Sequence, residues 1–299
     1  MDIQQTIFAN LDANHQIGPY KLGQVVGEGG VSVVVSADSI YSKTPVVLKL
    51  LPKSHDKRFH IAFEREYEVI TQLTHLNIVR VFDFGESEYV VYMAMEYIDG
   101  ITLHNVLQQE SRRIDIDIAI KLVCQIACAL DYIHRRGFVH RDVKPSNILV
   151  DNHTRALLLD FGTVLDLSEP KQRHETGIYG TSTYISPEQA QGFMDIDGRS
   201  DLYSLGVILY EMLTGRRPFY GSRNQLLHAH IKENPPAPSK FVYMSPELEG
   251  ILQKAIAKNP KERFQTGSEL NDALANVEIT QPSWFQDLQK SLQRMVNLV

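Results

Sequence analysis

Two periodicities of hydrophobic residues divide the chain. Up to about residue 97 the apolar residues form short β-branched and aromatic clusters separated by turn residues, and this pattern predicts strands. The clusters cover residues 25–26, 31–35, 46–50, 79–84 and 89–97. Between the third and fourth clusters, Phe59, Phe63, Tyr67 and Ile70 recur at helical spacing and predict one helix that ends near Leu73. Five strands and one helix make a small lobe.

Longer helices are predicted after residue 100. The apolar positions of one of them are Ile118, Leu122, Ile126, Leu130 and Ile133. Gly137 ends this helix as its C-terminal cap. Ser245 before Pro246 marks another helix start, and Thr266 with Glu269 forms a capping-box pattern before a further one. A strand-rich lobe followed by a helical lobe predicts an α+β protein with a cleft between two lobes.

We expect four segments: an N-terminal leader (1–19), the small lobe (20–97), the large lobe (98–278) and a C-terminal tail (279–299). Within the tail, apolar residues spaced three and four apart predict an amphipathic helix over residues 283–299. Docking of this helix on the large lobe is one interpretation of the spacing. The alternatives are that the helix forms a homodimer or links the chain to a missing sensor segment.

Composition narrows the classes of protein. The net charge of −6 argues against a nucleic-acid partner, because nucleic-acid binders carry basic surfaces. No apolar run approaches the roughly 18–20 residues that cross a membrane, and the polar N-terminus does not read as a signal peptide. Cys124 and Cys128 are too few for a disulfide framework or a four-ligand zinc site. We therefore expect a soluble, cytoplasmic chain with no membrane contact, whether complete or part of a longer protein.

A glycine-rich turn between two predicted strands is the first candidate for phosphate binding. Its residues are Val26, Gly27, Glu28, Gly29, Gly30, Val31, Ser32, Val33 and Val34. Backbone N–H groups in such a turn can approach phosphate oxygens without obstruction by a Cβ atom. A flexible hairpin tip would look the same. The turn is followed by a strand, and the chain lacks a GxxxxGK[ST] motif, so neither a dinucleotide fingerprint nor a P-loop is indicated.

Lys49 ends an apolar strand and would be costly to bury without an anionic partner. Glu64 and Glu66 on the following predicted helix are both candidates. A solvated strand edge is the competing interpretation.

The strongest chemical signal is residues 138–150. Asp142, Lys144 and Asn147 lie there between a helix end and an apolar strand, and Asp160 follows a second apolar strand. Phosphoryl transfer needs hard oxygen ligands for Mg²⁺, a cation near the phosphates and a carboxylate that orients the attacking hydroxyl. Structural salt bridges alone would not explain the whole set.

At these residues the sequence resembles the eukaryotic-like (Hanks-type) serine/threonine protein kinases in their bacterial form, over about residues 20–277. The resemblance implies the two-lobe kinase fold and transfer of the γ-phosphate of ATP, with Mg²⁺ or alternatively Mn²⁺, to protein substrates. It implies that Lys49 contacts the α- and β-phosphates and pairs with Glu66, chosen over Glu64 by its distance from His75. The other implied roles are Asp142 as catalytic base, Lys144 as γ-phosphate contact, and Asn147 and Asp160 as metal ligands.

The resemblance also implies an adenine site and a docking loop. The residues that would surround the adenine are Val34, Val47 and Leu149. Met95 occupies the gatekeeper position, and Glu96 and Ile98 offer hinge backbone groups. Residues 180–188 are similar to the substrate-docking loop and the end of the activation segment. Architectural features of the family are matched by Asp201, which begins a buried helix, and by Arg263, which would pair with Glu188.

Two residues imply serine/threonine specificity by the same resemblance. Lys144 lies two positions after Asp142, and Thr181 takes the position that contacts both. Arg141 beside Asp142 suggests control by phosphorylation, because an arginine without a partner there would repel the Lys49 side of the cleft. The candidate phosphosites are Thr176 first, then Thr181, with Ser182, Thr183 and Ser168 behind them.

The sequence departs from the family pattern at positions that carry no transfer chemistry. These are Ser32 for the third glycine, Leu76 for proline, Ser186 for alanine and Tyr203 for tryptophan. A nucleotide-binding pseudokinase and a small-molecule phosphotransferase are the alternatives. The first would lack transfer residues that this chain has. The second would lack the motifs at residues 186–188 and at Asp201.

Overall fold

The small lobe is built on an antiparallel sheet of six strands, in a computed structural model that describes residues 16–109, 113–169, 180–193 and 195–277. The strands follow the order β1-β2-β3-β4-β6-β5 across the sheet. Their bounds are β1 Gln16–Ile17, β2 Tyr20–Glu28, β3 Val33–Ser39, β4 Pro45–Pro52, β5 Val81–Glu86 and β6 Val90–Glu96. Because side chains alternate along a strand, Val46, Leu48 and Leu50 of β4 are buried together in the core on one face.

Strand β1 corrects the expectation of five strands. Ile17 pairs with Tyr20 and is only 1% exposed, although it belongs to the predicted leader. Gly18 between them has a φ of 52°, a conformation that glycine adopts without strain. Two residues are too few to show the alternation of buried and exposed side chains in a strand, so the hydrophobic pattern did not mark Ile17 as part of one. Residues 1–15 of the leader and the predicted tail helix lie outside the described residues.

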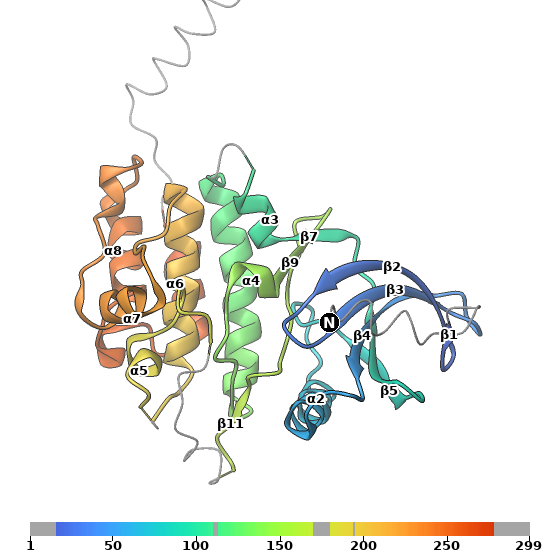
Figure 1. Ribbon diagram of the computed structural model, residues 1–299. Helices are drawn as coiled ribbons and strands as arrows, with labels where there is room; N and C mark the ends of the chain where they lie inside the picture. The colour runs from blue at the N-terminus through green and yellow to red at the C-terminus, as the bar shows by residue number, and fades with distance from the viewer. Residues whose placement is uncertain (1–15, 110–112, 170–179, 194, 278–299) are drawn as a thin grey trace, which may run out of the picture.

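Helix α2 (Lys57–Ile70) lies beside the sheet (Figure 1). Asp56 caps its N-terminus by accepting a hydrogen bond from the Arg58 N–H at 2.9 Å. Its buried residues include Phe63 and Glu66, so one carboxylate is carried on the face that points inward.

The large lobe is mostly helical, as expected (Figure 1). Its α-helices are α3 Leu103–Leu107, α4 Ile116–His134, α5 Pro187–Ala190, α6 Arg199–Thr214, α7 Arg223–Lys232, α8 Pro246–Ala255 and α9 Gly267–Ala275. Short 3-10 turns are η1 Pro145–Asn147, η3 Pro238–Lys240 and η4 Pro260–Glu262. Two small sheets contain β7 Gly100–Thr102, β9 Ile148–Asp151 and β10 Ala156–Leu158, and β8 Phe138–Val139 with β11 Leu165–Asp166.

The predicted helix starts differ in how completely they are capped. Ser245 accepts from the Leu248 N–H at the start of α8, and Thr266 accepts from the Glu269 N–H at the start of α9. The capping box at α9 is incomplete, because Glu269 accepts from the Gln265 N–H and not from the cap residue itself.

Helix α6 is the central element of the large lobe, with contacts to α4 and α8. Nearly every residue of it is buried, as expected for a helix enclosed on all sides. A Cβ atom on Gly206 would come within 2.8 Å of the Ala255 side chain, so glycine allows the close approach of α8. The helix ends at Gly215, which has a φ of 72°.

Backbone and side-chain hydrogen bonds join the two lobes. The Leu158 N–H donates to the Asn77 carbonyl at 2.8 Å, and the Asn77 amide donates to Gln125 at 2.9 Å. These contacts tie the segment after α2 to helix α4 and strand β10. Within the described part of the chain, no helix combines the length and the apolar character needed to cross a membrane.

Candidate active site

Lys49 connects three elements at the junction of the lobes. Strand β4 carries it, and its Nζ lies 2.7 Å from both carboxylate oxygens of Glu66 on α2 and 3.0 Å from Oδ1 of Asp160. Asp160 belongs to the large lobe, 111 residues away in sequence. The structure therefore brings three sequence-predicted site residues into direct contact, and places Glu66 rather than Glu64 beside the lysine.

The electrostatics of this group favour the charged forms of Lys49 and Asp160. Burial disfavours the ammonium of Lys49, but Glu66 and Asp160 outweigh that effect and raise its pKa. Burial alone would also raise the pKa of Asp160, yet the charge and hydrogen bond of Lys49 lower that pKa to about 2. The side chain of Asp160 keeps 45% of its surface exposed, so an ionised oxygen is available to a ligand.

Asp142 lies in the loop between β8 and η1 and is the centre of a second group. Lys144 Nζ donates to Asp142 Oδ2 at 2.6 Å. Thr181 donates to Asp142 Oδ1 through both its N–H and its hydroxyl, each at 3.0 Å, and Lys144 also contacts the Thr181 hydroxyl at 3.1 Å. The Asn147 amide nitrogen donates to the Asp142 carbonyl at 3.0 Å, which leaves its carboxamide oxygen for another partner.

Asp201 at the start of α6 holds the backbone before Asp142. Its two carboxylate oxygens accept from the N–H groups of His140 and Arg141, both at 2.8 Å, and His134 contacts it at 2.8 Å. Arg141 has a φ of 65°, in the left-handed region that side chains disfavour. This carboxylate therefore stabilises a strained loop. The sequence marked Asp201 as architectural, and no local signal shows which backbone groups it contacts.

Arg141 does not lack a partner, so that part of the sequence interpretation is wrong. Its side chain is largely buried, and its Nε donates to the Thr163 carbonyl at 2.6 Å. The Thr163 hydroxyl in turn donates to the His140 carbonyl at 3.0 Å. The segment after Asp160 is thus attached to the loop that carries Asp142.

The predicted nucleotide residues of the small lobe share one face of the sheet with Lys49. Directly opposite residues on neighbouring strands face the same side, and Val34 is opposite Lys49 while Val47 is opposite Met95. Val47 and Lys49 are two apart on β4, so all four side chains lie on that face, and all are half-buried. Leu149 on β9 of the large lobe is also half-buried.

The remaining predicted nucleotide residues lie in two short segments. In the glycine-rich turn, β2 ends at Glu28, β3 begins at Val33, and the Gly29 N–H donates to the Ser32 carbonyl at 2.8 Å. Val26 is exposed at the edge of this hairpin. Glu96 ends β6, and Ile98 follows it, half-buried against the main core.

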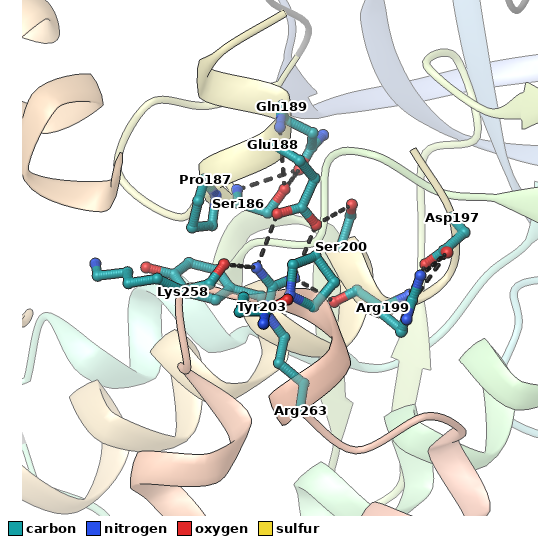
Figure 2. A network of polar contacts seen from close by, with 12 residues as sticks. Ser186, Pro187, Glu188, Gln189, Asp197, Arg199, Ser200, Tyr203, Lys258 and Arg263 are labelled. Carbon is teal, nitrogen blue, oxygen red and sulfur yellow. Dashed lines mark hydrogen bonds and ion pairs between the residues drawn. The ribbon is translucent and has the colours of Figure 1, made fainter. Parts of the chain in front are cut away.

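The segment after Thr181 is anchored by a buried ion pair (Figure 2). Glu188 accepts from Arg263 at 2.7 and 2.8 Å and from the Ser200 hydroxyl at 2.6 Å. Ser186 and Gln189 form a complete capping box at α5, and the Gln189 amide donates to the Arg141 carbonyl at 2.9 Å. Sequence reasoning did not identify Gln189 as a contact of the loop that carries Asp142.

A divalent cation fits the donors that are present. Among the described residues, no group of three or more His, Cys, Asp or Glu side chains could hold a metal. Mg²⁺ does not need such a group, because it commonly uses one or two protein oxygens with waters and substrate phosphates. The Asn147 and Asp160 oxygens would supply that small ligand set. Thr176 lies outside the described residues.

Comparisons with known proteins show which family the chain resembles. Residues 20–275 match the family model described as protein kinase domain. The chain is 37% identical over 277 residues to the serine/threonine-protein kinase PknB of Mycolicibacterium smegmatis, covering 88% of this chain and 43% of the relative. A probable serine/threonine-protein kinase of Streptomyces coelicolor is 37% identical over 263 residues, covering 85% of this chain and 39% of the relative.

A probable PknB of Bifidobacterium longum is 37% identical over 268 residues, covering 84% of this chain and 38% of the relative. The chain thus spans less than half the length of these curated relatives.

Proposed function

Because this chain belongs to the protein kinase domain family, in its bacterial serine/threonine branch, we propose that it transfers the γ-phosphate of ATP to serine and threonine hydroxyls of proteins. The observation that carries the proposal is the contact of Lys49 with both Glu66 and Asp160. One cation of the small lobe thereby meets one carboxylate from each lobe. Such an arrangement suits a phosphate chain bound between them.

Each transfer residue has a role that its contacts support. Mg·ATP supplies the transferred phosphoryl group and the cation that offsets its charge. Lys49, held by Glu66, would contact phosphate oxygens, and the oxygens of Asn147 and Asp160 would hold the cation. Val34, Val47, Met95 and Leu149 would surround the adenine, with hinge groups from Glu96 and Ile98.

Asp142 would accept the proton of the attacking hydroxyl. Its two oxygens are oriented by Lys144 and Thr181, so the carboxylate has one defined position. Lys144 also brings a positive charge to the place where charge develops on the transferred group. The contact of Thr181 with Asp142 supports residues 180–188 as the docking loop, because a substrate serine or threonine must come close to Asp142.

A radiometric assay with a generic protein substrate tests the proposal. We expect Asp142→Asn to lower the rate by about 10²–10⁴-fold, because the general base is removed. Asp272→Asn, which removes an exposed carboxylate from α9, is the matched control and should keep wild-type activity. Equal labelling by wild type and Asp142→Asn would mean a pseudokinase. ATP turnover on metabolites without protein labelling would mean a small-molecule phosphotransferase.

Autophosphorylation of the activation segment is the second part of the proposal, with Thr176 as the first site and Thr181 as the second. Arg141 supports it, because a phosphate near this buried arginine could form charge-assisted hydrogen bonds. Mass spectrometry of wild type and Lys49→Met should show at least one phosphosite between residues 163 and 185 that the variant loses. Identical phosphosites in both proteins would refute it.

The proposed partners are protein substrates, and the proposed compartment is the cytoplasm, where ATP is available and Cys124 and Cys128 stay reduced. Dimerisation remains a prediction, because the amphipathic pattern that suggests it lies outside the described residues.

A further inference from the structure

Tyr203 and His230 form a buried polar pair that the transfer mechanism does not use. Tyr203 lies on α6 and His230 on α7, and both side chains are fully buried. The Tyr203 hydroxyl lies 2.9 Å from His230 Nδ1, and His230 Nε2 lies 3.0 Å from the carbonyl oxygen of Thr183. Three segments distant in sequence, α6, α7 and the docking loop, thus meet in one chain of hydrogen bonds.

Only one arrangement of donors and acceptors satisfies this series of hydrogen bonds. A carbonyl oxygen only accepts, so His230 Nε2 must carry the hydrogen that bonds to Thr183. In the neutral imidazole Nδ1 is then an acceptor, and the Tyr203 hydroxyl must donate to it. The opposite tautomer would turn a lone pair of Nε2 towards the lone pairs of the carbonyl. By donating to Nδ1, the Tyr203 hydroxyl stabilises the tautomer that binds the Thr183 carbonyl.

The surroundings keep His230 neutral. Burial lowers the pKa of His230 to about 4, although the hydrogen bond to Thr183 opposes this, and the positive charge of Lys258 adds to the lowering. Lys258 donates to the carbonyl oxygens of Ala229 and His230 at 3.1 and 2.8 Å and lies over the Phe219 ring at 4.6 Å. The ring of Tyr203 also lies against the guanidinium of Arg263, which forms the buried ion pair with Glu188 (Figure 2).

Thr183 belongs to a turn formed by residues 181–184, and the first residue of this turn contacts Asp142, the proposed base. The Tyr184 N–H donates to the Thr181 carbonyl at 3.0 Å, which closes the turn. Thr181 donates to Asp142 through its N–H and its hydroxyl. The last two residues of the turn are held through their carbonyl oxygens. The carbonyl of Thr183 accepts from His230, and that of Tyr184 accepts from the Ser204 hydroxyl at 2.7 Å. A shift of Thr183 and Tyr184 would therefore move Thr181 away from Asp142.

We propose that Tyr203 and His230 are positioning residues for the protein substrate, which act by fixing the docking-loop turn through the Thr183 carbonyl. The inference rests on the proposed function, because it assigns the turn a role in presenting a hydroxyl to Asp142. Loss of the chain of hydrogen bonds weakens binding of the protein substrate. Binding of ATP depends on Lys49 and the sheet, which these residues do not contact, and stays unchanged.

Tyr203→Phe tests the proposal with little change in shape. Tyr210→Phe is a matched control, because Tyr210 is fully buried on the same helix and its hydroxyl donates to the Pro236 carbonyl at 3.0 Å, away from the turn. Both variants lose one buried hydrogen bond and should lose similar thermal stability. We expect only Tyr203→Phe to raise KM for a peptide substrate, by about three- to tenfold, with KM for ATP unchanged.

Variants at His230 provide the second measurement. The amide of glutamine can donate to Thr183 from nearly the same place as Nε2, whereas leucine cannot. We expect His230→Gln to keep a peptide KM near that of wild type and His230→Leu to raise it. Equal peptide KM values for Tyr203→Phe and Tyr210→Phe, or for the two His230 variants, would overturn the inference while leaving the kinase activity intact. A wild type without Asp142-dependent labelling would overturn the proposed function, and this inference with it.

Discussion

Glu188 and Arg263, which are 75 residues apart in the sequence, form a buried two-point ion pair in which every N–H of the guanidinium has an acceptor. Two N–H groups donate to the Glu188 carboxylate. The other three donate to the carbonyl oxygens of Ala257, Arg199 and Lys258 at 2.7, 3.0 and 2.9 Å. The pair attaches helix α5, which follows Thr181, to the segment between η4 and α9. Because the Arg263 side chain is 0% exposed, its charge depends wholly on these partners.

Replacing Arg263 with methionine should therefore be strongly destabilising. The Glu188 carboxylate would remain buried without its partner, and we expect a loss of about 3–5 kcal/mol in the free energy of unfolding. The control is Arg199→Met, which removes a partly exposed pair with Asp197 and should cost at most about 1 kcal/mol. Urea unfolding followed by circular dichroism measures both. Similar losses in the two variants would show that burial of the Glu188 pair adds nothing.

Glu66→Gln should impair the use of ATP. Without the carboxylate on α2, Lys49 loses one of the two carboxylates that contact it and is drawn towards the other, that of Asp160. We expect kcat/KM for ATP to fall by about 10- to 100-fold. Glu64→Gln is the matched control on the exposed side of the same helix and should behave as wild type. Steady-state kinetics with ATP varied decide the matter, and an equal effect of the two variants would contradict the assignment of Glu66.

The hydroxyl of Thr181 should contribute to transfer through its contacts with Asp142 and Lys144. Thr181→Val keeps the shape of the side chain and removes the hydroxyl, and we expect kcat to fall by about tenfold. Thr181→Ser keeps the hydroxyl and should retain most of the activity. If the valine variant were as active as the serine variant, the Thr181 hydroxyl would not contribute to orienting Asp142.

The stability of the protein should fall in mild acid because of His230. Burial lowers the pKa of His230 to about 4, compared with about 6.5 for an unfolded histidine. Between these values the unfolded chain binds a proton that the folded chain does not, so the free energy of unfolding decreases as the pH falls. Between pH 7.5 and pH 5 this residue should account for a loss of about 2 kcal/mol.

His230→Gln removes this proton uptake and is compared with wild type by urea unfolding at both pH values. The wild type should lose more stability than the variant over this interval. Equal losses would mean that His230 does not titrate in the expected way.

Much of the local structure could be read from the sequence because it depends on neighbouring residues. The helical spacing of Phe59, Phe63, Tyr67 and Ile70 predicted α2, whose bounds the structure places at Lys57–Ile70. Ser245 before Pro246 predicted the start of α8, which begins at that proline. The order of the predicted elements also indicated the two-lobe fold, because a strand-rich segment and a helical segment each form a lobe with buried apolar residues. The roles assigned to the transfer residues stay predictions, although the structure brings those residues together.

Contacts between distant segments were decided only by the tertiary structure. Strand β1 is defined only by its pairing with β2, because two residues are too few to show the alternation of a strand. Whether Arg141 lacks a partner depended on the position of the Thr163 carbonyl. The link from Tyr203 through His230 to Thr183 depended on how the fold brings these three residues together. The sequence by itself determined which chemical groups this protein carries and the elements that hold them. Packing decided which of those groups meet, because hydrogen bonds and ion pairs form only within a few ångströms.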